Sequence, residues 1–110
     1  MIERHRVASI DQLVESAGQR VDVAGHRIAL FLVGADVYAI GDRCSHAEAS
    51  LADGEVFDEA VECPRHGSEF DLRTGKPSAF PATQPVPVYV VEVEGSDVFV
   101  SVEPMAEDEA

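Results

Sequence analysis

Residues 44–71 read CSHAEASLADGEVFDEAVECPRHGSEFD, and the rest of the chain is organised around this stretch. It contains both cysteines of the protein, Cys44 and Cys63, and a histidine follows each of them closely, His46 or His66. Two thiolates and two imidazoles suit a tetrahedral zinc ion, or a diiron cluster with both thiolates on one iron and both imidazoles on the other. The pattern therefore predicts a metal site formed by two loops.

The way the ligands are shared between the loops favours iron. Structural zinc sites usually pair cysteine with cysteine and histidine with histidine. Here Cys44-x-His46 and Cys63-x-x-His66 each supply one cysteine and one histidine. A cluster with thiolates on one iron and imidazoles on the other needs this mixed supply, because each loop must reach both irons. Two readings stay open beside it: zinc in the same four ligands, and cysteines that are merely buried apolar side chains.

The segments C-S-H and C-P-R-H-G-S-E-F-D resemble the signature of Rieske [2Fe–2S] proteins. The resemblance also includes the Asp53-Gly54 turn, the turn at 71–75 and the proline-rich segment 77–87, and it covers most of residues 4–102. It implies one [2Fe–2S] cluster as the cofactor. Cys44 and Cys63 would hold the buried iron, and His46 and His66 the outer one.

The resemblance also implies four neighbours of the cluster: Ser68, Phe70, Arg65 and Pro81. High-potential relatives have a hydroxyl at the position of Ser68 and a tyrosine at that of Phe70, and this chain keeps only the first. We therefore expect a potential in the lower part of the Rieske range, roughly −150 to +300 mV. Arg65 would moderate that value, and Pro81 would lie in a loop, 77–82, that covers the cluster.

Short apolar segments separated by glycine and aspartate predict an all-β fold. We expect one domain over residues 1–110, an antiparallel sandwich or barrel with a small inserted cluster-binding subdomain at about 42–82, as the resemblance to the Rieske fold implies. One helical turn after Ser9 would end at Gly18, and the acidic tail, about 103–110, would be disordered. The predicted strands are 4–10, 20–24, 27–33, 37–40, 55–57, 60–62, 86–93 and 98–102.

The 110 residues carry a formal net charge of −13, and the charge is unevenly distributed. From residue 28 onward 17 acidic residues face four basic ones, all four within 43–76. This excess argues against nucleic-acid binding and suits transient partners met by electrostatic steering, although solubility alone would also explain it. No run of 18 apolar residues occurs, so we expect no membrane span and a cytoplasmic protein; both cysteines are assigned to the metal site, which leaves none for a disulfide.

The sequence thus predicts a soluble one-electron carrier rather than an enzyme. The resemblance implies a monomer that passes electrons from a flavin-dependent reductase to a terminal ring-hydroxylating, non-heme iron oxygenase. One alternative keeps the cluster but places it in iron–sulfur cluster assembly or in another reductase system. A second alternative is a zinc-stabilised β module for protein interactions.

Overall fold

The computed structural model describes residues 2–44, 49–65, 67–79 and 84–103, which form two antiparallel β-sheets and two short 3-10 helices, η1 (Ile10–Gln12) and η2 (Leu51–Asp53). The larger sheet has the order β1-β10-β9-β4-β3-β2 and contains β1 (Glu3–Ser9), β2 (Gly18–Val23), β3 (His26–Val33), β4 (Asp36–Gly41), β9 (Val88–Glu94) and β10 (Asp97–Val102). The smaller sheet follows chain order: β5 (Glu55–Phe57), β6 (Ala60–Glu62), β7 (Glu69–Asp71) and β8 (Pro77–Ala79). Neither helix is long enough or apolar enough to cross a membrane.

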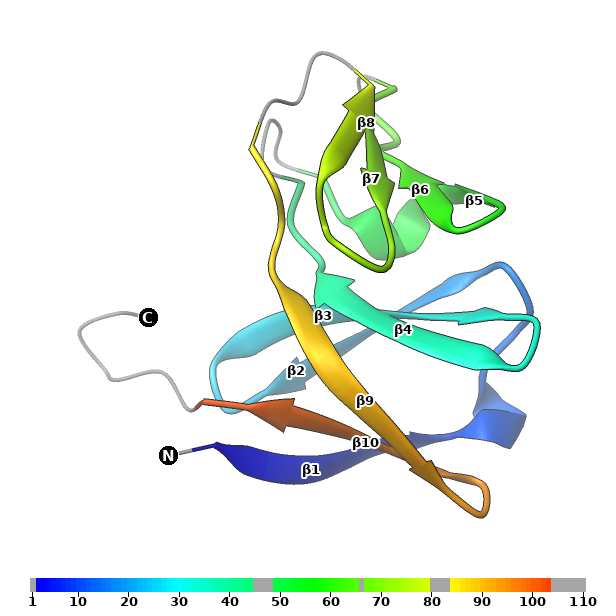
Figure 1. Cartoon of the computed structure of the whole chain (residues 1–110), viewed down its shortest axis with the longest axis vertical. Helices are drawn as coiled ribbons and strands as arrows, with labels where there is room; N and C mark the ends of the chain where they lie inside the picture. The colour runs from blue at the N-terminus through cyan, green and yellow to red at the C-terminus, as the bar shows by residue number, and fades with distance from the viewer. Residues whose placement is uncertain (1, 45–48, 66, 80–83, 104–110) are drawn as a thin grey trace.

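The larger sheet curls so that its first and last strands, β1 and β2, approach each other and enclose a core (Figure 1). Strand β10 shows the period of two that this requires, because Val98, Val100 and Val102 are buried while the residues between them are half-exposed. The smaller sheet stands above the larger one and is inserted between β4 and β9 of the chain (Figure 1). The predicted all-β antiparallel fold is confirmed.

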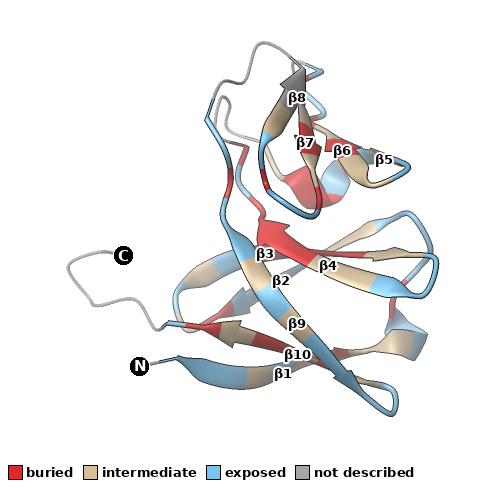
Figure 2. Cartoon of the chain, in the orientation of Figure 1, coloured by how far each residue is buried: buried red, intermediate tan, exposed pale blue. Residues whose placement is uncertain are grey.

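The middle of β3, residues 28–31, is buried on both faces because it separates two cores. Figure 2 shows buried segments in both sheets. Ile28 and Leu30 belong to the core inside the larger sheet, and Ala29 and Phe31 belong to the core beneath the smaller sheet. This arrangement explains why the sequence of β3 is a continuous apolar run rather than an alternating one. The core that contains both cysteines therefore packs against the buried middle of β3.

Several predicted boundaries were wrong. The helical turn after Ser9 ends at Leu13, and Gly18 does not end it but opens β2. A Cβ atom at Gly18 would lie 2.4 Å from the backbone oxygen of Ala52, so glycine is required there by close packing of β2 against η2. Strands β7 and β8 were missed; β8 takes up 77–79 of the proline-rich segment as an edge strand, the place where proline is tolerated. The predicted disordered tail lies, from 104 onward, outside the described residues.

Candidate functional site

Two loops of equal size carry the two cysteines. Loop 1 (44–49) follows β4, and loop 2 (63–68) connects β6 to β7. In each loop the cysteine N–H donates to the carbonyl oxygen five residues later: Cys44 to Ala49 at 3.1 Å and Cys63 to Ser68 at 2.6 Å. The same hydrogen bond therefore closes both loops at their base, with the cysteine at the same position in each.

The two thiols are buried in one continuous core. Cys44 is 4% exposed and Cys63 is 1% exposed, and both belong to the buried cluster that includes Leu51 and Phe70. The two sulfur atoms are not joined in a disulfide. Two thiols that start equivalent loops from a shared apolar floor form a donor set suited to a soft metal centre, because burial excludes water from the sulfur atoms.

The structure describes three of the six predicted site residues besides the cysteines. Ser68, the last residue of loop 2, and Phe70 on β7 are fully buried, while Arg65 within the loop is exposed. In loop 2 the N–H of Gly67 donates to the oxygen of Cys63 at 3.2 Å, and its φ of 72° is a backbone conformation that glycine favours. His46, His66 and Pro81 lie outside the described residues. Among the described residues no three metal-ligating side chains come together.

Asp42, two residues before Cys44, is a site residue that the sequence did not predict. Its side chain is fully buried, and its Oδ1 accepts hydrogen bonds from the Ser50 hydroxyl at 2.6 Å and the Ala52 N–H at 3.0 Å. Its Oδ2 accepts from Nε of Arg27 at 3.2 Å and lies 3.1 Å from Nη2. Aspartate after a strand is ordinary in turns, so only the buried position distinguishes this one, and burial of a single charge leaves no periodic signal in a sequence.

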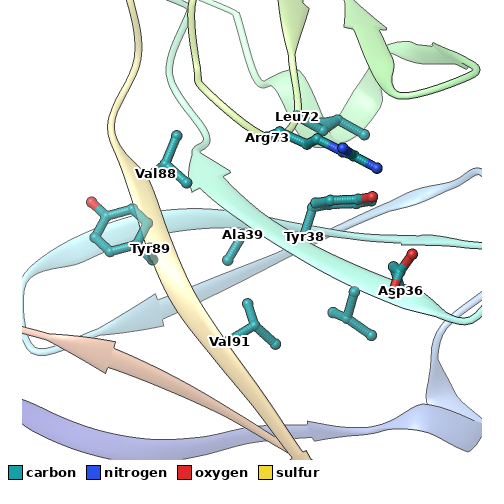
Figure 3. Close-up of a pocket in the computed structure, with 9 residues that line it drawn as sticks. Asp36, Tyr38, Ala39, Leu72, Arg73, Val88, Tyr89 and Val91 are labelled. Carbon is teal, nitrogen blue, oxygen red and sulfur yellow. The ribbon is translucent and has the colours of Figure 1, made fainter.

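A separate open cleft of about 410 Å³ lies where β4 and β9 diverge (Figure 3). These strands pair only through Ala39 with Tyr89 and Ile40 with Val88, so side chains line a gap beyond that point. None of the predicted site residues that the structure describes lines the cleft.

Tyr38 and Arg73, both at this cleft, connect the two sheets through Glu59. The Tyr38 hydroxyl donates to the Glu59 carboxylate at 2.7 Å, and Nε of Arg73 donates to the same oxygen at 2.5 Å. The hydrogen bond to Glu59 raises the pKa of Tyr38, and the hydrogen bonds from Tyr38 and Arg73 lower the pKa of Glu59. The three groups clamp the turn after β7 to the larger sheet.

We expect Tyr38→Phe to lower the melting temperature at neutral pH by only about 2–4 °C, because the clamp is solvent-accessible and its hydrogen bonds are screened. Since folding raises the Tyr38 pKa above its ordinary value of 10.0, the folded chain keeps a proton that the unfolded chain loses, and stability falls as the pH rises above about 10. The variant should lose less stability between pH 9 and 11 than the wild type in thermal melts. If the pH dependence of stability were the same in the variant and the wild type, the Tyr38–Glu59 hydrogen bond would not be its cause. Ser101→Ala, a replacement on β10, serves as the control.

Comparison with known proteins identifies similar chains. The family model described as "Rieske [2Fe-2S] domain" matches residues 3–90. The ferredoxin subunit of 3-phenylpropionate/cinnamic acid dioxygenase from Shigella boydii serotype 4 (strain Sb227) is 55% identical over 74 residues, which are 66% of this chain and 70% of that protein.

Two solved structures of ferredoxins are also similar to this chain. The ferredoxin of carbazole 1,9a-dioxygenase from Nocardioides aromaticivorans IC177 is 42% identical with a TM-score of 0.85, over 88% of this chain and 95% of that one. A chain in a complex of reduced oxygenase and oxidised ferredoxin of carbazole 1,9a-dioxygenase is 34% identical with a TM-score of 0.85, over 94% and 97%.

Proposed function

Because this chain belongs to the family of Rieske [2Fe–2S] domains, we propose that its two loops hold one [2Fe–2S] cluster and that it delivers electrons to a terminal oxygenase. The family membership decides the choice between iron and zinc in favour of the iron–sulfur cluster. The chain is an electron-transfer component and not a catalyst, as its relatives are ferredoxin subunits of dioxygenases.

The residues present fit such a cluster. Cys44 and Cys63 start two loops that are closed by the same hydrogen bond, and this equivalence is the observation that carries the proposal. Each loop also contains one histidine, His46 within 44–49 and His66 within 63–68. We propose that the buried cysteines bind one iron and the two histidines bind the other. When bound, such a cluster would supply one-electron transfer.

The remaining residues would exclude water and adjust the potential. Phe70 and Leu51 form an apolar floor beneath both thiols, and hydrogen bonds to sulfur raise the potential of an iron–sulfur cluster. Phe70 offers no hydroxyl for this purpose, so we propose a potential in the lower part of the Rieske range. Arg65, exposed on loop 2, would change the potential little because water and salt screen its charge.

We expect Ser68→Ala to lower the potential further. Ser68 is fully buried, and its backbone oxygen accepts the hydrogen bond that closes loop 2 at Cys63. If its hydroxyl serves the cluster, loss of one hydrogen bond worth about 1 kcal/mol corresponds to a decrease of about 40 mV for one electron. Redox titration followed by optical absorbance measures the change. Ser101→Ala, the same replacement on β10, is the control, and equal potentials for both variants would remove this role from Ser68.

The relatives and the charge support a proposal about partners. We propose that a flavin-dependent reductase supplies the electron and that a ring-hydroxylating oxygenase receives it, each in a transient complex with a monomer of this chain in the cytoplasm. The net charge of −13 supports contacts with basic surfaces, whose association rates fall as salt rises. Short-lived complexes of this kind let one small carrier serve two partners in turn.

Two measurements test the proposal in sequence. The purified protein should be red-brown, bleach with dithionite and then give a rhombic electron paramagnetic resonance (EPR) signal of the Rieske type. The reduced protein should next be mixed with the terminal oxygenase of an aromatic-ring dioxygenase, its aromatic substrate and oxygen. Reoxidation of the carrier should be much faster than without the oxygenase and should slow at high salt. A colourless, iron-free protein would refute the cluster, and unchanged reoxidation would refute the oxygenase as partner.

A further inference from the structure

The two loops are closed alike but stand on different supports. Loop 2 rests on a hairpin, since β6 and β7 pair in continuous register from Ala60 with Asp71 to Glu62 with Glu69. Loop 1 has β4 before it and the short helix η2 after it, and the described residues flanking it pair through one isolated bridge, Arg43 with Ser50. Loop 1 therefore needs another source of order.

The carboxylate of Asp42, which precedes loop 1, forms hydrogen bonds to residues that follow the loop. Ser50 and Ala52, its two partners through Oδ1, lie on the far side of loop 1 in the chain. The backbone oxygen of Asp42 also accepts from the Leu51 N–H at 2.6 Å, as part of the Arg43–Ser50 bridge. One buried residue thus ties the start of loop 1 to its end.

Arg27 connects the same carboxylate to the larger sheet. Its guanidinium contacts Oδ2 of Asp42 at 3.2 and 3.1 Å, and its backbone oxygen accepts the Asp42 N–H at 3.0 Å. The Arg27 side chain is 41% exposed and the Asp42 side chain is fully buried, so Arg27 links a core carboxylate to the protein surface. A buried carboxylate is costly without partners, and removing one partner leaves the charge uncompensated. The four donors around Asp42 compensate the charge of its buried carboxylate.

We propose that Asp42 is a positioning residue of the iron–sulfur centre: it holds loop 1 in register with loop 2 and places a fixed negative charge, paired with Arg27, two residues before the ligand Cys44. This inference rests on the cluster ligation proposed above. It explains why the pair acts on loop 1, which lacks the hairpin that supports loop 2. A merely structural pair would change stability alone, whereas a charged pair near the cluster also changes its potential, with a sign set by the charge removed.

The test compares two arginine–aspartate pairs. Asp42→Asn removes a negative charge and should raise the midpoint potential; Arg27→Gln removes a positive charge and should lower it. The controls are Asp22→Asn and Arg20→Gln, since Arg20 contacts Asp22 at 3.4 Å on β2 and is 46% exposed, close to Arg27 at 41%. These controls carry the same charge changes in an exposed pair on β2 and should leave the potential unchanged.

Cluster loss to an iron chelator is the second readout. We expect Asp42→Asn to lose its cluster about tenfold faster than Asp22→Asn, because a hydrogen bond to a charged group is weakened at the base of loop 1. Arg27 is half-exposed, so Arg27→Gln should fold and bind the cluster even if Asp42→Asn does not. Potentials of Arg27→Gln and Arg20→Gln that agree, with equal rates of cluster loss, would overturn the inference. A wild-type protein without a Rieske-type EPR signal would instead overturn the proposed function beneath it.

Discussion

Replacing Cys63 by serine is expected to abolish the red-brown colour and the EPR signal, and to reduce bound iron to below about a tenth of the wild-type content. Cys63 is 1% exposed and lies at the base of loop 2. The other cysteine of the chain, Cys44, is proposed to bind the same iron, so no thiol remains to replace the lost sulfur. A serine hydroxyl is a much harder and less readily ionised ligand than a thiol, and iron–sulfur clusters are held by thiolates. The loss of one of two thiolates should therefore prevent assembly.

The same variant should still fold in its larger sheet. That sheet has its own core, with Ile28, Leu30 and Val100 fully buried and separate from the core around the cysteines. We expect far-UV circular dichroism to keep most of its β signal while the smaller sheet loses order, because metal binding and folding are coupled where a site joins two loops. Val61→Ala is the matched control: it truncates another fully buried side chain of the same core but leaves both thiols in place.

Iron analysis of both variants separates ligand loss from core damage. Val61→Ala should be less stable than the wild type, by about 1–2 kcal/mol, yet retain its colour. Cys63→Ser should be colourless at any stability. A Cys63→Ser protein that retains the Rieske-type signal and two irons per chain would show that this cysteine is not a ligand.

The sequence predicted the fold class and the family, but not what supports the two loops. Cys44 and Cys63 could be proposed as ligands because cysteines close to histidines form a rare, local pattern. The apolar run Ile28–Phe31 predicted a central strand but not its second core, since periodicity does not reveal which sheet covers the other face. Strand β7 was missed because its three residues, 69–71, alternate in burial over too short a stretch to be recognised.

The buried support could not be predicted for a physical reason. Asp42 has the ordinary sequence context of a turn, and its partners Ser50 and Arg27 are distant from it in the chain. Gly18 likewise looked like the end of a helical turn, whereas its role is the close approach of Ala52 from η2. Both features depend on contacts between the larger sheet and the residues after loop 1, and such contacts exist only once both sheets are folded.

Gly54→Ala should destabilise the cluster strongly, although it adds only one methyl group. Gly54 ends η2, and its φ of −80° is allowed for any residue, so alanine would cause no backbone strain of its own. A Cβ atom there would lie 2.0 Å from the backbone oxygen of Glu62 and 3.0 Å from Cγ2 of Val61. Glu62 directly precedes Cys63, so Gly54 is the point where the support of loop 1 touches that of loop 2.

Relief of this clash requires backbone movement, because the opposing atom is a carbonyl oxygen and not the end of a flexible side chain. Moving β6 away from η2 would displace Cys63 relative to Cys44, and overpacking of this kind costs about 3 kcal/mol. We therefore expect Gly54→Ala to be purified with little cluster, and to lose the remainder to a chelator at least about tenfold faster than the wild type. Visible absorbance per iron and per chain, followed over time, measures both effects.

Gly34→Ala provides the matched control because its loss of stability would come from backbone strain and not from a steric clash. Gly34 has a φ of 63°, which disfavours alanine by about 1 kcal/mol, but no heavy atom lies within 4 Å of its Cβ position in the β3–β4 turn. That variant should lose some stability and keep its full cluster content. If Gly54→Ala retained the cluster as well as Gly34→Ala does, the two loops would not depend on this contact for their separation. If only Gly54→Ala loses it, the spacing between the loop supports, and not the overall stability of the chain, determines whether the cluster is held.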